Sequence, residues 1–322
     1  MNVTLQEEIH LGKRLKIKAK KAVEYRVLYL FLLPAILSCL IFNYRPMVGV
    51  VMAFQDYNVI KGLWGSPFVG LHHFKEFLQD PYFYKALKNT IGINGLSILI
   101  GYPLPIIFAL VIFSIKNGPF KRITQTISYL PHFISWVVVA GLVYRVLDEY
   151  TGMVNMIIKA LGHPPVSFLS NPSYFWILSI AVGIWKEVGW YTILYLAALA
   201  GVDAEQYEAA DIDGATGFNK LIYITLPGIS TTIGLTIILS AGSLISASGY
   251  AAFVPFDAIF NLRNPLISST ANTIDFYVYQ SGIMGTKYSY STAIGITQSS
   301  IAFCAVFFAN WLSKKTRGYG VF

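Results

Sequence analysis

Long apolar runs alternate with shorter polar segments along most of this 322-residue chain. A helix of about 20 residues crosses the ~30 Å hydrocarbon core of a membrane, and six runs reach that length. Backbone groups in lipid must pair within their own segment, and the runs lack the alternation of membrane-spanning strands. We therefore predict an all-α polytopic membrane protein with six transmembrane helices, over residues 27–52, 90–114, 125–147, 174–200, 228–248 and 292–313.

Composition and charge add an orientation to this picture. The chain is 55% hydrophobic and only 12% charged, which is too apolar for an ordinary soluble protein. Its lysines and arginines gather in the arm before the first span, in the loop 116–122 and in the tail 314–317. Positive residues near helix ends stay on the cytoplasmic side, so we place these segments and both termini there. The formal charge of +8 is then a topology signal and does not indicate nucleic-acid binding.

The loops on the opposite side are longer and contain many glycines, prolines and aromatic residues. We expect them to form short amphipathic or re-entrant pieces at the outer surface. Lysines in the first of these loops suit either an anionic polymer or the acidic rim of a binding protein. The three loops span residues 55–88, 148–173 and 249–291, and the lysines are Lys61, Lys75, Lys85 and Lys88.

Sequence signatures of catalysis are absent from the chain. The stretch "GATGFNK" has a glycine and a lysine, but it lacks the spacing and terminal hydroxyl of a phosphate-binding loop. There is no nucleophile elbow, zinc-binding helix or CxxC pair, and the five histidines are scattered. We therefore expect no enzyme activity, no metal site and no bound cofactor in this chain, so the energy for any transport must come from a partner.

An acidic segment, residues 202–228, interrupts the apolar pattern between two predicted spans. It holds five acidic residues from Asp203 to Asp213 and no basic residue before Lys220. Asp203 can cap a helix over residues 204–212, with Gln206 completing a capping box. Gly214 then ends that helix with a positive φ angle.

A second short helix is predicted to follow, over residues 216–226. It presents four apolar side chains on one side, and Pro227 starts the next span because it cannot donate to a continuing helix. Anionic lipid would repel an acidic surface helix, so a basic protein partner on the cytoplasmic side fits better. The apolar side chains are Phe218, Leu221, Ile222 and Leu226.

The same segment resembles the EAA loop of the permease subunits of binding-protein-dependent ABC importers. That pattern reads E-A-A, three residues, G, nine residues, then I-x-L-P, and seven positions match: Glu208, Ala209, Ala210, Gly214, Ile224, Leu226 and Pro227. The likeness to the maltose-permease-like sugar group covers nearly all residues after 30, through "FVGLHHFKEFLQDPYFYKALKNT", "GMVNMIIKALG", "WKEVGW" and "YSTAIGITQSSIAFCAVFFANWLSKK". Within that group it is strongest to permeases of complex oligosaccharides, including an alginate importer.

The resemblance implies an ABC type I importer in the bacterial inner membrane. Its parts are a second permease subunit, two ATPase subunits that carry ATP and Mg²⁺, and an external binding protein that delivers an oligosaccharide, either neutral or acidic and alginate-like. In this chain it implies a basic arm over residues 1–27, a six-helix domain over 28–313 with an EAA coupling loop over 203–227, and a tail over 314–322.

The resemblance also assigns roles within the coupling loop. Glu208 meets basic residues of the ATPase, Ala209 and Ala210 permit close docking, and Gly214 sets the bend. We count the neighbouring Asp213 among the coupling residues. Closure of the ATPase subunits would then move the loop and rock the adjoining spans.

Ionisable residues inside a span mark a substrate path by default, and Lys186 and Glu187 lie in the fourth span. Adjacent helical residues point about 100° apart, so we expect that the two cannot face one partner. Aromatic side chains suit a sugar site, and they share faces with these two residues. The alternative is that Lys186 and Glu187 pair with neighbouring helices for assembly. The candidate path residues are Lys186, Glu187, Trp190, Tyr191, Tyr195 and Ser243.

Pro103 and Pro105 within the second span predict a kink or a local unwinding. Such an interruption either exposes backbone near the cargo or is a structural kink without a transport role.

The alternative to an ABC permease is an ion- or proton-coupled secondary carrier, with Lys186 and Glu187 as the relay. A membrane-embedded assembly protein without a path is the other alternative. Neither alternative needs an acidic docking loop.

Overall fold

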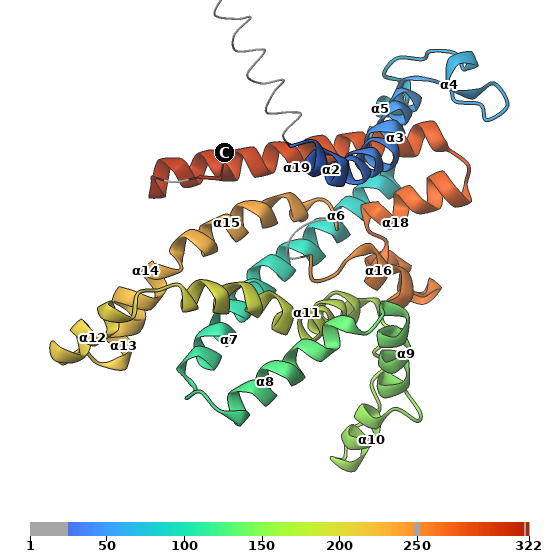
Figure 1. The fold of residues 1–322 in the computed structure, drawn as a ribbon. Coiled ribbons are helices and arrows are strands. Elements are labelled where there is room, and N and C mark those ends of the chain that lie inside the picture. Colours follow the sequence, from blue (N-terminus) through green and yellow to red (C-terminus); the bar gives the residue numbers. More distant parts are fainter. Residues whose placement is uncertain (1–24, 248–251, 319, 322) are drawn as a thin grey trace, which may run out of the picture.

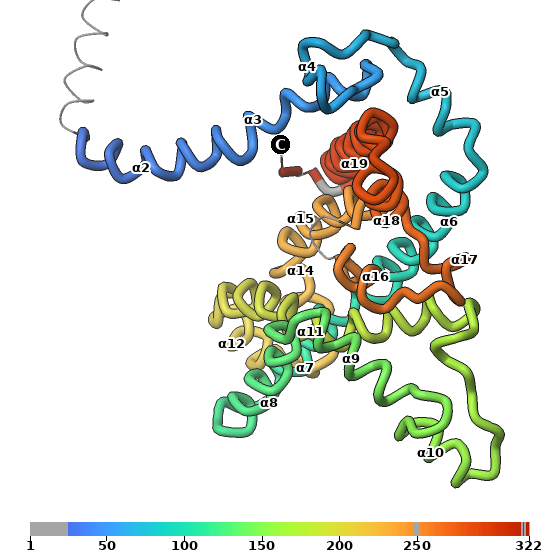
Figure 2. Tube along the Cα trace, turned by 90° about the vertical axis from the view of Figure 1, so that its right-hand side faces the viewer, coloured from blue at the N-terminus to red at the C-terminus, as the bar shows by residue number. Residues whose placement is uncertain are grey.

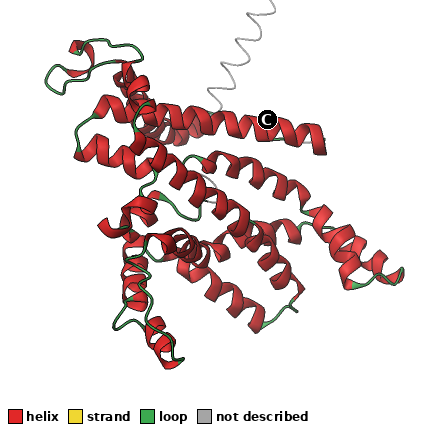
Figure 3. Ribbon diagram, turned by 180° about the vertical axis from the view of Figure 1, so that it is seen from behind, coloured by secondary structure: helices red, strands yellow, loops and turns green. Residues whose placement is uncertain are grey.

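The computed structural model describes residues 25–247, 252–318, 320 and 321, and this part of the chain is helical without a strand (Figure 3). One isolated antiparallel bridge joins Gln55 to Phe68. Four helices are long and apolar enough to cross a membrane, or six if each of two bent pairs counts as one span. The predicted all-α membrane fold is confirmed, while most of the basic N-terminal arm lies outside the described residues.

The first span is a helical run of 29 residues, Arg26–Phe54, which projects from the body of the molecule (Figure 2). Its most apolar stretch has no residue buried within the chain. A surface this apolar needs lipid or another protein against it. The run consists of α2 (Arg26–Cys39), a π-helical turn (Leu40–Tyr44), α3 (Arg45–Met47) and a 3₁₀ segment (Val48–Phe54).

The second span, Pro81–Ser114, contains the predicted irregularity. A π-helical turn, Ser97–Gly101, separates α6 (Pro81–Leu96) from α7 (Pro103–Ser114). Pro103 has no N–H to donate, and the wider turn before it accommodates the lost hydrogen bond.

The third predicted span, 125–147, is not one straight helix. It is bent by 99° between the helical run Pro119–Phe133, which includes α8 (Pro119–Tyr129), and α9 (Trp136–Leu147). Pro131 removes a backbone donor, Ile134 is extended, and the Ser135 hydroxyl accepts from Val138 N at 3.4 Å to begin α9. One helical run therefore ends at Phe133 and another begins at Trp136, within a region that we predicted as a single span.

The fourth span contains one long α-helix without a π-helical or 3₁₀ break. Helix α11 (Phe175–Ala200) runs for 26 residues without interruption and packs against α7 and α8. A methyl group at Gly189 would lie 2.0 Å from the Ser128 carbonyl oxygen, so only glycine permits the observed approach of α8.

The fifth span differs in both of its ends from the prediction of 228–248. Helix α15 (Ser230–Ala241) and a 3₁₀ turn to Leu244 follow a 57° bend after Gly228. Pro227 does not start this span. It lies within the preceding helical run, two residues after a π-helical turn (Leu221–Thr225) that accommodates its missing donor. The sixth span belongs to α19 (Tyr288–Arg317).

The three loops that we predict to lie on the outer side contain short helices, as expected. They pack onto the ends of the long helices and bury aromatic residues such as Phe77, Phe253 and Phe276. These helices are α4 (Gly62–Gly65), α5 (His72–Leu78), α10 (Met153–Ala160), α16 (Phe256–Leu262), α17 (Ser268–Ala271) and α18 (Ile274–Tyr279). The remaining helices, α12 (Ala204–Ile212), α13 (Gly217–Lys220) and α14 (Leu226–Gly228), protrude at the opposite end of the molecule (Figure 1).

Candidate coupling loop and buried charge cluster

The acidic segment folds as two short helices joined by a tight turn. Asp203 caps α12 through a 3.0 Å hydrogen bond from Glu205 N, and α12 has the predicted bounds. Gly214 has φ +71°. The N–H groups of Gly214 and Ala215 donate to the carbonyls of Asp211 and Ala210 at 3.1 and 2.8 Å. This pair of bonds is a Schellman motif, which confirms the predicted role of the glycine.

The second helix of the loop is held against the first. Thr216 caps it by accepting from Asn219 N at 3.3 Å, and Lys220 forms an ion pair with Asp211. The Tyr207 hydroxyl lies 3.0 Å from Thr225 Oγ1 across the two helices. These contacts make the loop a unit of fixed shape, so a force on one helix reaches the other.

The surface of this unit combines acidic and apolar side chains. Glu208 and Ile212 share one face of α12, since they are four residues apart. Ile212 is 88% exposed, Phe218 68% and Tyr223 76%, although all three are large and apolar. Exposed apolar side chains rimmed by charge mark protein contacts. The sequence analysis did not single out Ile212 and Tyr223 as contact residues, because a sequence does not show which apolar side chains stay exposed in the fold.

The other predicted coupling residues, which are the EAA positions and Asp213, differ in their exposure. Ala209, Asp213, Gly214 and Pro227 are exposed, while Ala210, Ile224 and Leu226 are half-buried. The pattern therefore combines positions that face outward with positions that attach the loop to the rest of the fold.

Lys186 and Glu187 meet the same partner, contrary to our expectation. Glu187 Oε2 lies 2.6 Å from His132 Nδ1, and Lys186 Nζ donates to the His132 carbonyl at 2.5 Å. Lys186 Nζ also lies 3.1 Å from Glu187 Oε1. The expectation was wrong because His132 lies between the directions in which Lys186 and Glu187 leave the helix. The four methylenes of the lysine are long enough to bring its amine to the same residue.

Aromatic rings enclose this cluster of Lys186, Glu187 and His132. Trp190 stacks on the His132 ring at 4.1 Å with an interplanar angle of 3°, and Lys186 Nζ lies 5.6 Å from the Trp136 ring centre. Lys186 and Glu187 are 4% and 8% exposed. His132 follows α8 just before the 99° bend, so the cluster fastens that bend to α11.

The other path candidates lie elsewhere. Tyr191 contacts Phe253 with ring centres 5.2 Å apart, and the buried Tyr195 hydroxyl lies 2.9 Å from Thr236 Oγ1 on α15. Ser243 is buried beyond the end of α15. The structure thus joins Lys186, Glu187 and Trp190 in one cluster with His132, while Tyr191 and Tyr195 contact Phe253 and Thr236.

A cleft of about 1250 Å³ opens at the far end of the molecule from the coupling loop, among α6, α11, α17, α18 and α19. Of the four outer-loop lysines, Lys85 and Lys88 line it and Lys61 and Lys75 do not. Other polar and aromatic side chains of the lining include Tyr82, Asn89, Trp176, Asn272, Gln280 and Lys287.

Asp80 lies in this cleft as an acceptor for two tyrosines. Its Oδ2 accepts from Tyr277 and, at 3.0 Å, from Tyr290. Burial acts to raise the pKa of Asp80, but these hydrogen bonds, one from Tyr82 N and the charge of Lys287 hold it below its usual value. Burial, followed by the bond to Asp80, raises the pKa of Tyr277 to about 12.

Comparison with known proteins gives consistent results along the chain. A family model described as the inner membrane component of binding-protein-dependent transport systems matches residues 101–318. Protein LplB of Bacillus subtilis (strain 168) is 41% identical over 295 residues, which cover 92% of this chain and 91% of LplB. The polygalacturonan/rhamnogalacturonan transport system permease YteP of the same organism is 38% identical, with coverage of 96% and 94%.

Solved structures show the same likeness. A chain of a bacterial alginate ABC transporter, in complex with an alginate pentasaccharide-bound periplasmic protein, matches with a TM-score of 0.83 and 38% identity. The match covers 94% of this chain and 99% of that one.

Proposed function

Because the chain belongs to the inner-membrane components of binding-protein-dependent transport systems, we propose that it is one permease subunit of an ATP-driven oligosaccharide importer. It is a transport component and not an enzyme. The observation that carries the proposal is the exposed, rigid coupling loop with Glu208 and Phe218 on its surface. Family membership argues against a secondary carrier, which has no use for such a loop.

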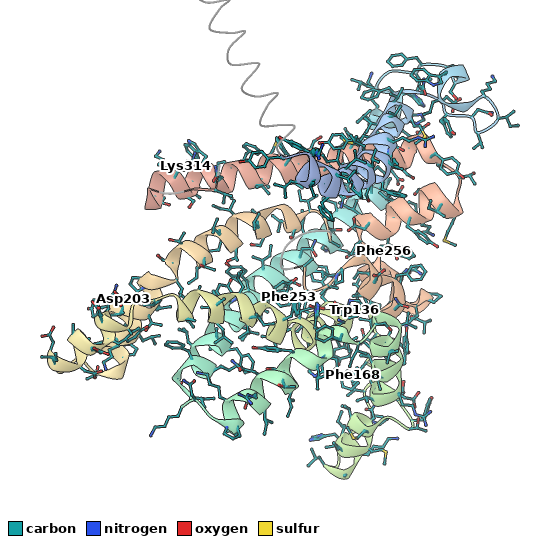
Figure 4. All side chains as sticks on the ribbon, viewed as in Figure 1. Trp136, Phe168, Asp203, Phe253, Phe256 and Lys314 are labelled. Carbon is teal, nitrogen blue, oxygen red and sulfur yellow. The ribbon has the colours of Figure 1, made fainter. Side chains whose placement is uncertain are left out.

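Two ATPase subunits are the proposed partners of the coupling loop, and they bind the ATP and Mg²⁺. Glu208 meets basic residues in a cleft of one ATPase, while Ile212 and Phe218 supply apolar contact. Lys314, near the end of α19, lies at the same end of the molecule as Asp203 (Figure 4). This arrangement supports a cytoplasmic location for the C-terminus, and the basic arm supports the same for the N-terminus.

A second permease subunit is the proposed partner of the first span. Helix α2 has no residue buried within this chain, although its span is apolar enough to cross a membrane. Packing across it by a second subunit would bury that surface and would close the substrate path between the two chains. Lipid covers what remains.

The proposed cargo is an acidic oligosaccharide, delivered by an external binding protein. YteP is named for polygalacturonan and rhamnogalacturonan, and the solved relative carries alginate. Lys85, Lys88 and Lys287 place positive charge in the outer cleft, while Trp176 and Tyr82 offer aromatic faces for sugar rings. In this arrangement the buried Lys186 and Glu187 hold the bend next to the path and do not bind sugar themselves.

Reconstitution of the complete transporter in vesicles tests the coupling role. Glu208→Lys should abolish uptake and substrate-stimulated ATP hydrolysis, because the reversed charge would face basic residues of the ATPase. Gln206→Lys adds positive charge to the same helix at an exposed position about 200° around the axis from Glu208, so it is the matched control and should retain most activity. Normal coupled uptake by Glu208→Lys would refute the docking role.

Two further measurements test the importer class and the cargo. Vesicles that contain the permease subunits without ATPase should take up nothing, and uptake down a gradient would contradict an ABC importer. Oligogalacturonate and alginate oligosaccharides should stimulate ATP hydrolysis more than neutral oligosaccharides of equal length. Equal or greater stimulation by the neutral sugars would contradict the acidic cargo.

A further inference from the structure

Helix α5, at the rim of the outer cleft, brings two histidines and a glutamate together. One ligand atom from each of His72, His73 and Glu76 lies within 4.8 Å of the other two. The helix is anchored, since Phe77 is 1% exposed and Phe74 contacts Phe54 with ring centres 5.3 Å apart. The three side chains therefore project from a fixed backbone.

The surroundings of His73 determine which of its nitrogens carries a proton. Nε2 lies 3.1 Å from the backbone carbonyl oxygen of Gln55, and a carbonyl can only accept, so Nε2 is the donor. The other nitrogen, Nδ1, faces Glu76 Oε2 at 3.2 Å. In the neutral ring Nδ1 bears a lone pair, and two lone pairs at this distance repel unless a positive species lies next to both.

This pattern matches the surroundings of metal-bound histidines. Such a histidine nearly always donates its second ring N–H to a carbonyl or carboxylate, which fixes the ring and its tautomer. His73 has this arrangement through Gln55. The 3.2 Å between Nδ1 and the carboxylate is also close to the roughly 3.4 Å that separates two ligands of a tetrahedral zinc ion with bonds of about 2.1 Å.

We propose that His72, His73 and Glu76 bind a zinc ion at the outer surface. Two imidazoles and one carboxylate are a donor set that suits zinc, and hard cations such as Ca²⁺ and Mg²⁺ prefer oxygen ligands alone. His72 is exposed, so its ring is free to turn toward the other two ligands. The fourth position stays open to water.

The ion would have a local mechanical effect as well as a charge. It would connect adjacent turns of α5, and His73 would transmit that restraint to the Gln55 backbone after the first span. Glu76 also lines the outer cleft, so the ion would add positive charge to its rim. Our sequence-based expectation of no metal site treated His72 and His73 as scattered, because a short spacing alone does not reveal the backbone carbonyl opposite them.

The test uses the assembled permease and ATPase complex, purified with a tag free of histidine and stripped with a chelator. Isothermal titration with Zn²⁺ should show one tight site for each copy of this chain. His72→Ala and Glu76→Gln should each weaken it about 100-fold, in line with the sensitivity of metal sites to their ligand environment. His163→Ala, at an exposed histidine after α10, is the matched control and should leave the affinity unchanged.

Spectroscopy provides a second measurement that does not depend on transport. Cobalt(II) at this site should give the intense visible absorption of a tetrahedral ion, and His72→Ala should remove it. The competing explanation is that only a proton lies between His73 and Glu76. In that case the unmodified complex would bind zinc no more tightly than its His72→Ala and Glu76→Gln variants. That result, or an equal loss in His163→Ala, would overturn the proposal.

Discussion

The crossing of α8 over α11 gives a sharp prediction, because Gly189 leaves no room for even one carbon. The added carbon of Gly189→Ala would lie 2.0 Å from the Ser128 carbonyl oxygen, and such carbons essentially never approach within 3.0 Å. The obstacle is backbone and cannot turn aside. Helix α8 must therefore retreat by at least the difference of 1.0 Å.

That retreat has a calculable consequence one helical turn further on. His132 lies four residues after Ser128, and a shift of about 1 Å is enough to break its 2.6 Å hydrogen bond with Glu187. Overpacking of this kind costs about 1–3 kcal/mol. We expect Gly189→Ala to lower both the melting temperature of the purified subunit and the rate of uptake.

Thermal unfolding in detergent, followed by tryptophan fluorescence, measures the effect. Gly141→Ala is the matched control, because it also lies within a helix and an added carbon there meets nothing within 4 Å. It should be neutral or stabilising by roughly 0.5–1 kcal/mol, the usual preference for alanine over glycine in helices. A Gly189→Ala protein as stable as Gly141→Ala would refute the close crossing.

Three further outcomes are expected. Glu187→Leu should destabilise the subunit by about 3–5 kcal/mol, since it strands Lys186, and Lys186→Met combined with Glu187→Leu should recover much of the loss in unfolding assays. Gly214→Ala should cost about 1–2 kcal/mol at a positive φ and reduce coupling of ATP hydrolysis to uptake. The pKa of Asp80 is lowered in the folded chain, so the stability that its carboxylate gives the fold should be present above pH 3.8 and be lost as the pH falls further. Asp80→Asn should flatten this part of the acid-unfolding curve.

Each of these outcomes has a result that contradicts it. A double variant no more stable than Glu187→Leu alone would show that Lys186 is not stranded. Gly217→Ala, where φ is ordinary and the space is open, controls for Gly214→Ala, and equal effects would exclude backbone strain. An Asp80→Asn protein with the wild-type acid profile would show that another group dominates.

Most long helices could be predicted from the sequence because apolar length alone decides them. The helix 204–212 and the turn at Gly214 were predicted for a similar reason, since a cap and a glycine act within a few residues. Gln206 was assigned to a capping box, whereas the observed cap bond goes to Glu205 N. Local chemistry thus located the element but not each of its hydrogen bonds.

The features that the sequence did not reveal depend on distant contacts. His132 and Glu187 are 55 positions apart, and no spacing rule links a histidine in an apolar run to a charge on another helix. The 99° bend was missed because apolar residues such as Leu130, Phe133 and Trp136 surround Pro131 and Ser135, so the apolar run reads as continuous although α8 is more polar than α9. In each case the deciding information is which helices cross, and where.

Helix α11 connects the two ends of the molecule, and its crossing with α8 divides it unequally. At 1.5 Å per residue, the 26 residues form a rod about 39 Å long, with roughly 21 Å on the side of Phe175 and 17 Å on the side of Ala200. A rod that pivots at Gly189 would act as a lever that enlarges a displacement about 1.3-fold from its Ala200 end to its Phe175 end. A small stroke of the coupling loop would then move the cleft wall at Trp176 further, and in the opposite direction.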